Sequence, residues 1–190
     1  MAILVKICLL GDGAVGKTSL KNRYLGAGFN PKYLITIGAD FAVRDVKLPE
    51  LDVEYKLQIW DLAGQPRFDA VRTLYYKGSM GAILVFDITN RATLESLQSW
   101  VKEYWKHSGE TAIPMIILGN KKDLREQVPS CITEKEGKDF VETLSAKSST
   151  VGMKIHYLET SAKTGENVEE GFSRLVSEIH QYLKDSGTIS

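Results

Sequence analysis

The hydrophobic positions of this chain follow two patterns that alternate along its length. Short continuous apolar runs, bounded by glycine or polar residues, predict strands that are buried on both faces. These runs are residues 3–10, 81–87, 113–119 and, shorter, 155–159. Residues 39–48 and 53–61 predict two more strands, which we expect to pair antiparallel because only the turn at residues 49–52 separates them.

Apolar residues at helical spacing fill the intervals between these strands and predict helices. Residues 18–25 begin a helix after the first strand. Two pairs, Thr133 with Glu136 and Asn167 with Glu170, have the spacing of an N-terminal capping box. The apolar stripes of the later helices, which we interpret as core packing, are Leu94, Leu97, Val101 and Tyr104; Phe140, Val141 and Leu144; and Val168, Phe172, Leu175, Val176, Ile179 and Leu183.

Strands that alternate with helices predict an α/β fold, in which a mostly parallel sheet carries helices on both faces. Ligands of such sheets bind at the carboxyl ends of the strands. The 190 residues, of which 43% are hydrophobic, suit one domain with a full core and leave little room for a second.

The composition argues against several classes of function. Lysine plus arginine number 24, as do aspartate plus glutamate, and no basic block stands out, so we expect no nucleic-acid partner. Two cysteines, Cys8 in the first strand and Cys131 in a loop, cannot build a disulfide framework, which predicts a reducing, cytoplasmic compartment. Lys6 interrupts the first apolar run, so we expect no signal peptide, and no window reaches the length of a membrane span. The histidines lack metal-ligand spacing, and surface or capping roles are favoured for His107, His156 and His180.

The first apolar run leads directly into a segment with the pattern G-x-x-x-x-G-K-[ST]. Its residues are Gly11, Asp12, Gly13, Ala14, Val15, Gly16, Lys17 and Thr18. Between a strand and a helix, this pattern forms a phosphate-binding loop, whose glycines let the backbone surround an anion at the helix N-terminus. Lys17 would reach the β- and γ-phosphates, and the Thr18 hydroxyl would bind Mg²⁺. A chance glycine-rich turn would not explain the flanking strand and helix.

A second motif, residues 61–65, follows the strand at residues 56–60. Asp61, at the end of an apolar strand, is placed to hold Mg²⁺, directly or through water. Gly64 would bring a backbone N–H close to a γ-phosphate, and Gln65 would orient an attacking water. Taken alone, an ordinary turn explains these residues equally well, but the neighbouring phosphate loop favours the catalytic interpretation.

Residues 120–123 follow the predicted strand at residues 114–119 and predict a site for guanine. Asp123 offers two carboxylate oxygens that match the N1–H and N2–H₂ donors of guanine, whereas adenine presents an acceptor at N1. Asn120 would bridge the base and the phosphate loop, and the Lys121 stem would lie along the ring.

The last candidate loop follows the last predicted strand and contains Ser161, Ala162 and Lys163. Its backbone N–H groups would donate to guanine O6. Three small or polar residues are a weak signal by themselves. Their position matters more, because a loop after a parallel strand lies on the same edge of the sheet as the other motifs.

In this order, the four motifs resemble those of the Ras superfamily of small GTPases, from Leu4 to about Leu183. The resemblance implies a P-loop NTPase fold, the small G-domain, with a six-stranded mostly parallel sheet, one antiparallel strand and about five helices on both faces. It implies a single GTPase domain at residues 1–185 and a short polar tail at residues 186–190. It also implies GTP, GDP and Mg²⁺ as ligands.

Several segments resemble the Rab branch in particular, whose members are switches in membrane traffic. These segments are Ile37-Gly38-Ala39-Asp40-Phe41, Lys56-Leu57-Gln58-Ile59-Trp60, Arg67-Phe68, Tyr75-Tyr76-Lys77-Gly78, Phe86-Asp87-Ile88-Thr89-Asn90 and Leu158-Glu159-Thr160-Ser161-Ala162-Lys163.

The resemblance assigns roles to residues that the four motifs do not explain. Phe29 is similar to the aromatic residue that packs against guanine, and Tyr33 to the switch tyrosine that closes over the phosphates. Thr36 is similar to the threonine whose hydroxyl binds Mg²⁺ and whose N–H senses the γ-phosphate. Gly13 resembles the glycine that leaves room for the arginine of an activating protein, and Ser19 belongs to the implied nucleotide-binding set.

The implied reaction converts GTP and water to GDP and phosphate, with Gln65 positioning the water. The implied catalytic residues are Gln65, Lys17, Gly64 and Thr36, and the implied metal ligands are Thr18, Thr36 and Asp61. No arginine lies in the phosphate loop or just before Thr36, so we expect a slow enzyme that needs an activating partner. Arg67 is expected to be structural rather than catalytic.

Hydrolysis would relax the segments from Asn30 to Gly38 and from Leu62 to Thr73. Through these segments we expect effectors, an exchange factor and a GTPase-activating protein to bind a monomeric chain. An apolar surface for such partners would contain Ile37, Phe41, Trp60, Phe68 and Tyr75. Two of these residues, Phe41 and Trp60, could instead face the core.

Some positions depart from the family pattern. Leu62 replaces the usual threonine, and Pro66 replaces the usual glutamate after the catalytic glutamine. Pro66 lacks an N–H and a carboxylate that exchange factors use in related proteins, so we hypothesise that nucleotide exchange differs here. The turn at residues 49–52 and the segment at residues 145–152 are longer than is common.

Residues 184–190 contain no cysteine and therefore no prenylation motif. Either this is a truncated form, or the natural protein carries no lipid, as a deeply diverged prokaryotic relative could. Membrane contact is not encoded in this sequence, and we expect a cytoplasmic protein that is peripheral to membranes through partners or a missing lipidated tail.

Three other functions remain open. A P-loop ATPase or small-molecule kinase is disfavoured by Asp123 and by the lack of an arginine-rich lid. A nucleotide-locked binding module without turnover is disfavoured by Gln65, although Pro66 keeps it open. A structural scaffold with an empty site is disfavoured by the intact motifs.

Overall fold

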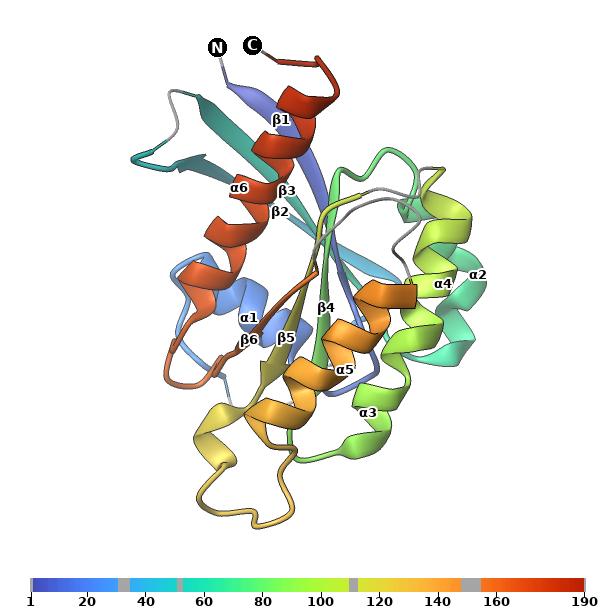
Figure 1. The fold of residues 1–190 in the computed structure, drawn as a ribbon, viewed down its shortest axis with the longest axis vertical. Coiled ribbons are helices and arrows are strands. Elements are labelled where there is room, and N and C mark those ends of the chain that lie inside the picture. The colour runs from blue at the N-terminus through green and yellow to red at the C-terminus, as the bar shows by residue number, and fades with distance from the viewer. Residues whose placement is uncertain (1, 31–34, 51–52, 110–112, 148–154, 190) are drawn as a thin grey trace.

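The computed structural model describes residues 2–30, 35–50, 53–109, 113–147 and 155–189 of the chain. Six strands form one sheet in the order β2-β3-β1-β4-β5-β6, which passes through the middle of the molecule (Figure 1). The strands are β1 Ile3–Leu10, β2 Ala39–Lys47, β3 Glu54–Leu62, β4 Gly81–Asp87, β5 Met115–Asn120 and β6 His156–Glu159. β2 and β3 pair antiparallel and the other neighbours pair parallel, which confirms the predicted fold class.

The central strands are buried on both faces because successive residues point alternately into two hydrophobic clusters. In β1, Val5 and Ile7 belong to the first cluster, whereas Cys8 and Leu10 belong to the second. The strands β4 and β5 alternate in the same way. The Cys8 side chain is fully buried, as expected of a core residue, and burial raises the pKa of its thiol to about 12.

Helices cover both faces of the sheet, with α1 and α6 on one face and α2 to α5 on the other (Figure 1). The helices are α1 Lys17–Tyr24, α2 Asp69–Arg72, α3 Arg91–Glu95, α4 Leu97–Ser108, α5 Glu134–Lys147 and α6 Val168–Asp185, with 3₁₀ turns η1 Pro66–Phe68, η2 Thr73–Tyr75 and η3 Lys122–Leu124. On the first face, the rings of Tyr24 and Phe172 stack with centroids 3.9 Å apart and join α1 to α6.

The predicted boundaries of the strands and of the first helix differ from the observed ones by at most two residues. The stripe from Leu94 to Tyr104 is divided at Ser96 into α3 and α4, but its members are buried as predicted. The capping box before α5 is confirmed. The Glu136 N–H donates to Thr133 Oγ1 over 3.2 Å, and the Thr133 N–H donates to the Glu136 carboxylate over 2.8 Å.

The prediction of a second capping box, at Asn167, is wrong. Asn167 has a left-handed backbone with φ of 56°, and its side chain makes no cap hydrogen bond. Its Nδ2 donates instead to the Glu159 carbonyl over 2.8 Å, and Glu170 forms an ion pair with Arg174. The carbonyl at the end of β6 is a partner that only the folded chain brings to Asn167.

The expectation that His180 serves at the surface or as a cap is also wrong. His180 is 8% exposed, and its Nδ1 lies 2.6 Å from the Tyr55 hydroxyl in the interface between α6 and β3. The pair satisfies two buried polar groups that would otherwise destabilise the core. His156 lies 2.6 Å from the Glu178 carboxylate at the edge of the sheet.

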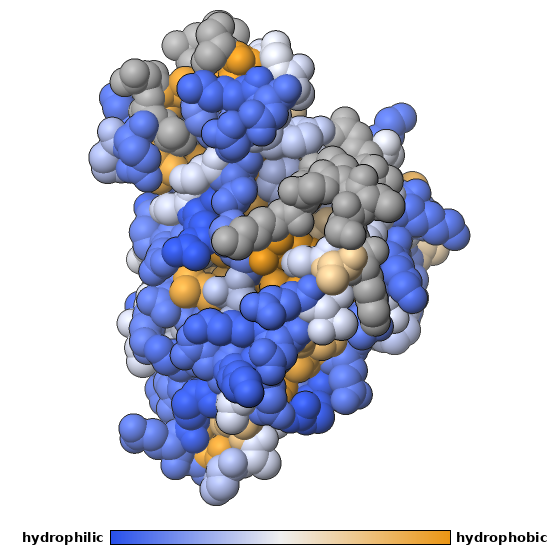
Figure 2. All heavy atoms as spheres, viewed as in Figure 1, coloured by the Kyte–Doolittle hydropathy of each residue, from blue (hydrophilic) through white to orange (hydrophobic). Residues whose placement is uncertain are grey.

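The surface seen in the view of Figure 1 is mainly hydrophilic, with hydrophobic residues in small areas between polar ones (Figure 2). Within the described part of the chain, no helix combines the length and the apolar character that crossing a bilayer requires.

The stacked pair between α1 and α6 gives a first prediction, for stability. Phe172→Ala should lower the free energy of unfolding by about 3–5 kcal/mol, because it removes a fully buried ring and leaves a cavity. Leu74→Ala, at a residue that is 75% exposed, should change it by less than about 0.5 kcal/mol. Urea unfolding under one fixed set of solution conditions measures both. Equal losses in the two variants would contradict the prediction.

Candidate functional site

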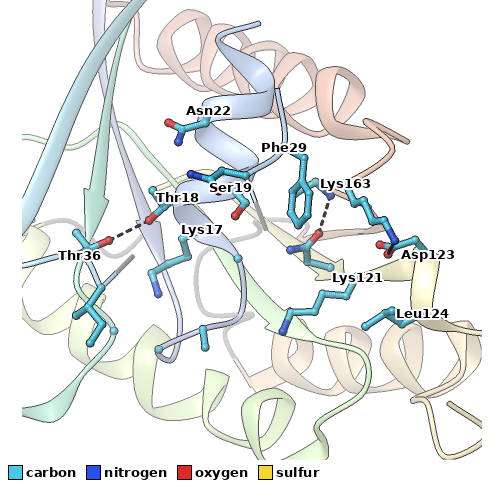
Figure 3. Close-up of a pocket in the computed structure, with 18 of the residues that line it drawn as sticks. Lys17, Thr18, Ser19, Asn22, Phe29, Thr36, Lys121, Asp123, Leu124 and Lys163 are labelled. Carbon is cyan, nitrogen blue, oxygen red and sulfur yellow. Dashed lines mark hydrogen bonds and ion pairs between the residues drawn. The ribbon is translucent and has the colours of Figure 1, made fainter. Parts of the chain in front are cut away.

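A cavity of about 480 Å³ lies at the carboxyl ends of the strands, where the predicted motifs meet (Figure 3). Loops after β1, β3, β5 and β6 line it, together with residues between α1 and β2. The predicted site residues that line it are Gly13, Ala14, Gly16, Lys17, Thr18, Ser19, Phe29, Thr36, Gly64, Gln65, Asn120, Lys121, Asp123, Ala162 and Lys163.

A few predicted site residues are not part of the cavity wall. Gly11, Asp12, Val15, Asp61 and Ser161 belong to the same loops and strand ends without lining the cavity. Tyr33 lies outside the described residues, so its predicted contact with the phosphates stays a prediction.

Lys17 holds a buried positive charge beneath the phosphate loop. Its Nζ donates to the carbonyls of Gly11 and Asp12, each over 2.7 Å. Burial lowers the pKa of the Lys17 ammonium to about 8, against the charges of Asp61 and Asp12, which raise it. Among the described residues, Lys17 forms no ion pair, so its side chain is well suited to an anionic ligand in the cavity.

Two glycines permit close approaches around this loop. A Cβ at Gly16, whose φ is 102°, would lie 2.2 Å from Asn120 Nδ2. A Cβ at Gly64 would lie 2.3 Å from the Gly11 carbonyl oxygen. Any side chain at Gly64 would therefore push the loop after β3 away from the phosphate loop, because backbone atoms cannot yield at such distances.

The Asp12 carboxylate is directed to α4. Its Oδ1 accepts from Trp100 Nε1 over 2.7 Å, and its Oδ2 accepts from Ser96 Oγ over 2.8 Å. The Arg72 guanidinium packs over the Trp100 ring at 4.0 Å. The side chain of Asp12 thus fixes the loop to the helix behind it, and the loop backbone is left to face the cavity.

The three predicted metal ligands lie together at one end of the cavity. Thr18 Oγ1 donates to Asp61 Oδ2 over 2.5 Å and lies 2.9 Å from Thr36 Oγ1 (Figure 3). Asp61 Oδ1 is buried and has no hydrogen-bond partner. Burial raises the pKa of the Asp61 carboxyl, against the hydrogen bond from Thr18 and the charges of Lys17 and Lys21.

This donor set fits Mg²⁺. Two hydroxyls and one carboxylate supply the hard oxygen ligands that Mg²⁺ prefers, and the ion usually takes one or two carboxylates together with phosphates and water. The described residues contain no cluster of three His, Cys, Asp or Glu side chains that could hold a metal ion by themselves. A metal at Asp61 would therefore share its coordination with the hydroxyls and a bound phosphate.

Asn120 joins the two ends of the site. Its Nδ2 donates to the Val15 carbonyl over 2.9 Å, and its Oδ1 accepts from the Ala162 N–H over 3.2 Å. The Asn120 side chain is 1% exposed, at the end of the buried strand β5. One side chain thus holds the phosphate loop and the loop after β6 at a fixed separation.

Asp123 stands at the other end of the cavity, beside Lys163 and Phe29 (Figure 3). Its Oδ1 accepts from Ser161 Oγ over 2.6 Å, and its Oδ2 lies 3.8 Å from Lys163 Nζ. The Lys121 ammonium forms an ion pair with Asp87 over 2.6 Å, so that the Lys121 stem lies along the cavity wall. Phe29 is 41% exposed at the rim.

Several residues near the cavity were not predicted from the sequence. Arg23 Nε donates to the Ala162 carbonyl over 2.9 Å, and its guanidinium also contacts the Lys163 carbonyl, so α1 supports the base end of the site. Asn22 and Leu124 line the cavity. No sequence pattern indicated these contacts, because they join segments far apart in the chain.

Gln65 lies at the phosphate end, directly before Pro66, the first residue of η1. A proline in the first helical position loses no hydrogen bond, since that N–H has no partner inside a helix. Proline also disfavours the helical conformation of the preceding residue, and Gln65 is extended, with φ of −90° and ψ of 140°. The proline is therefore compatible with a Gln65 side chain beside the cavity.

Arg67 is exposed, and its guanidinium packs 4.9 Å from the centroid of the Phe68 ring. The residue contacts its own neighbour and does not line the cavity.

Comparisons with known proteins agree with this geometry. A model of the Ras family matches residues 6–181. The Ras-related protein Rab-13 of Rattus norvegicus is 40% identical over 184 residues, which cover 97% of this chain and 83% of that protein. Rab-8B of Dictyostelium discoideum is 38% identical over 183 residues, which cover 96% of this chain and 83% of that protein. RAB1BV of Beta vulgaris is 37% identical over 185 residues, which cover 97% of this chain and 80% of that protein.

The chain belongs to the Ras family of small GTPases. Its similarity to Rab proteins over almost its whole length assigns it to the Rab branch. It binds GTP and GDP with Mg²⁺, hydrolyses GTP to GDP and phosphate, and acts as a nucleotide-dependent switch in vesicle traffic. Effectors, exchange factors and GTPase-activating proteins are its general classes of partner.

The geometry at Asp123 predicts how base specificity can be changed. In Asp123→Asn, one acceptor for guanine becomes an N–H donor, so GDP should bind about 100-fold more weakly or worse. Xanthosine diphosphate, with a carbonyl at C2, should bind the variant better than GDP. Competition against a fluorescent nucleotide measures both. Asp139→Asn, in α5 away from the cavity, is the matched control. Unchanged preference for guanine in Asp123→Asn would contradict the assignment of the base end.

Proposed function

We propose that the cavity holds one guanine nucleotide, with the base at Asp123 and the phosphates at Lys17, and that Gln65 orients the attacking water. One observation carries the proposal. A buried ammonium at Lys17 and a carboxylate at Asp123 line a single cavity, and Asp61, which has an unpaired buried carboxylate oxygen, bonds to Thr18 in the wall of that cavity. Each is complementary to a different part of a magnesium-bound nucleoside triphosphate.

In the proposed mechanism, Lys17 exchanges its carbonyl partners for the β- and γ-phosphate oxygens and offsets their charge. Bound Mg²⁺ supplies further positive charge to those phosphates. The Gly64 N–H donates to the γ-phosphate, and the Gln65 amide orients a water for in-line attack. The hydrogen bond that Asn120 accepts from the Ala162 N–H and the one that Ser161 donates to Asp123 join the two loops proposed to hold the base.

We propose that residues 30–38 and 62–73 report the nucleotide state. Thr36 and Gly64 would lose their γ-phosphate contacts on hydrolysis. The end of the second segment is anchored, because the buried Arg72 donates to the Glu103 carboxylate over 2.8 Å and to the Ala63 carbonyl over 3.3 Å. The conformational change of the second segment would therefore occur mainly between Gly64 and Arg72.

An apolar surface next to these segments would bind effectors. The rings of Phe41, Trp60 and Tyr75 form a row with centroid distances of 4.9 Å and 5.1 Å. Phe41 is 46% exposed and Ile37 is 79% exposed, whereas Trp60 packs partly against the second hydrophobic cluster. Large aromatic side chains that are partly exposed provide binding energy at protein interfaces.

The similarity to Rab proteins supports action at the periphery of membranes. We propose that the protein is cytoplasmic, works as a monomer and reaches a membrane through its partners or through a lipidated tail, and that it has no nucleic-acid partner.

The role of Gln65 is tested by single-turnover release of phosphate. Gln65→Leu should bind GTP normally but hydrolyse it at least about tenfold more slowly, because the water loses its orienting amide. Gln181→Leu, exposed in α6, should match the unchanged protein. The unchanged protein should prefer GTP to ATP by about 10⁴-fold or more. Preference for ATP, or no turnover of GTP, would contradict the proposed reaction.

Because Pro66 stands where related proteins have a glutamate, we predict that nucleotide exchange differs from that of those proteins. Pro66→Glu restores a carboxylate that exchange factors use in related proteins, so it should raise the response of GDP release to an exchange factor that acts on Rab relatives. Pro66→Ala, which removes the ring without adding a carboxylate, should respond like the unchanged protein. GDP release with and without the exchange factor measures the response. The hypothesis fails if Pro66→Glu and the unchanged protein respond equally.

A further inference from the structure

Lys21 is a buried lysine that has no role in the proposed mechanism. It follows Lys17 by four residues in α1 and therefore lies on the same side of the helix. The residue is 2% exposed, and lysines are almost never buried to this degree without a charged partner.

Its partner is Asp40, at the start of β2. Lys21 Nζ forms a hydrogen-bonded ion pair with Asp40 Oδ2, and the Asp40 side chain is 58% exposed. The ion pair joins a residue of α1 to a residue four positions after Thr36. The hydrogen bond from Lys21 holds the pKa of the Asp40 carboxyl below its usual range, which keeps the carboxylate charged.

Asp40 is also the direct cross-strand neighbour of the proposed metal ligand Asp61 in the register of β2 and β3. Two carboxylates placed opposite each other on neighbouring strands repel and destabilise the sheet. The Lys21 ammonium pairs with Asp40, and the register places Asp40 opposite Asp61, so its positive charge lies beside this pair of carboxylates. Lys21 therefore offsets a repulsion that the strand register itself creates.

We propose that Lys21 is a counter-cation for the Asp40 and Asp61 carboxylates, which weakens Mg²⁺ binding at Asp61 and holds β2 to α1 when the metal leaves. The inference rests on the proposed metal site at Thr18, Thr36 and Asp61. An ammonium near a divalent cation opposes its binding by direct repulsion. Because the ion carries two charges, a neighbouring ammonium changes its binding several-fold even at the dielectric constant of water.

The proposal makes opposite predictions for the two members of the ion pair. Lys21→Met removes the competing charge, so Mg²⁺ should bind about fivefold more tightly or better. Asp40→Asn leaves the whole Lys21 charge directed to Asp61, so Mg²⁺ should bind more weakly, by about threefold or more. A purely structural contact would move both variants in the same direction, since both lose the same ion pair.

The full chain, loaded with a fluorescent GDP analogue, provides the measurement. The rate of nucleotide release is followed while free Mg²⁺ is varied, and the midpoint of this titration reports the Mg²⁺ affinity. Lys56→Met is the matched control, because Lys56 forms a cross-strand ion pair of 3.1 Å with Asp45 farther along the same two strands. Its midpoint should stay within about twofold of the unchanged protein. Asp40 is largely exposed, so Asp40→Asn tests the proposal even where loss of Lys21 impairs folding.

The outcomes separate the metal site from the role of Lys21. A lower midpoint in Lys21→Met and a higher one in Asp40→Asn would support the proposal. If nucleotide release depends on Mg²⁺ but neither variant changes the midpoint, the role of Lys21 alone is overturned. The same conclusion follows if both variants move the midpoint in the same direction. Release that is independent of Mg²⁺ in the unchanged protein would overturn the proposed metal site and this inference with it.

Discussion

The hydrogen bonds of Asn120 are the constraint on which the arrangement of the site depends. This side chain is buried at the end of β5, where it donates to the Val15 carbonyl and accepts from the Ala162 N–H. It thereby ties the loop after β1 to the loop after β6, although β4 and β5 separate these strands in the sheet. Because a buried amide left without partners would be costly, the two loops keep a fixed separation. That one residue therefore links the two loops that line opposite ends of the cavity.

The short helix α1 contributes to every part of this site. Lys17 and Thr18 face the proposed phosphate and metal positions, and Arg23 supports the loop that carries Ala162 and Lys163. Lys21 reaches the start of β2. The helix α1 packs against α6 through the stacked rings of Tyr24 and Phe172. Residues at the proposed metal and base positions, and the contact to β2, therefore share one helix that packs against α6.

Much of the fold could be predicted because its signals are local. A continuous apolar run such as residues 81–87 predicts a doubly covered strand, and Thr133 with Glu136 can form a capping box from their spacing alone. Asn167 and Glu170 have the same spacing, yet the Asn167 side chain bonds to the end of β6. His180 likewise pairs with the Tyr55 hydroxyl, 125 positions away. Spacing describes which bonds are possible within a segment, whereas distant partners decide which of them form.

The sequence by itself determined the order and type of the strands, the edge of the sheet where ligands bind, and the chemical identity of most site residues. These follow from hydrophobic period, from glycine and lysine spacing, and from the rule that parallel strands end on one edge. Only the tertiary structure decided that the Asp12 carboxylate would be held by Trp100, that Asp40 would oppose Asp61, and that Lys21 would be buried and paired with the exposed Asp40. Such contacts join elements that are remote in the chain, and their energies depend on burial and strand register, which no single segment contains.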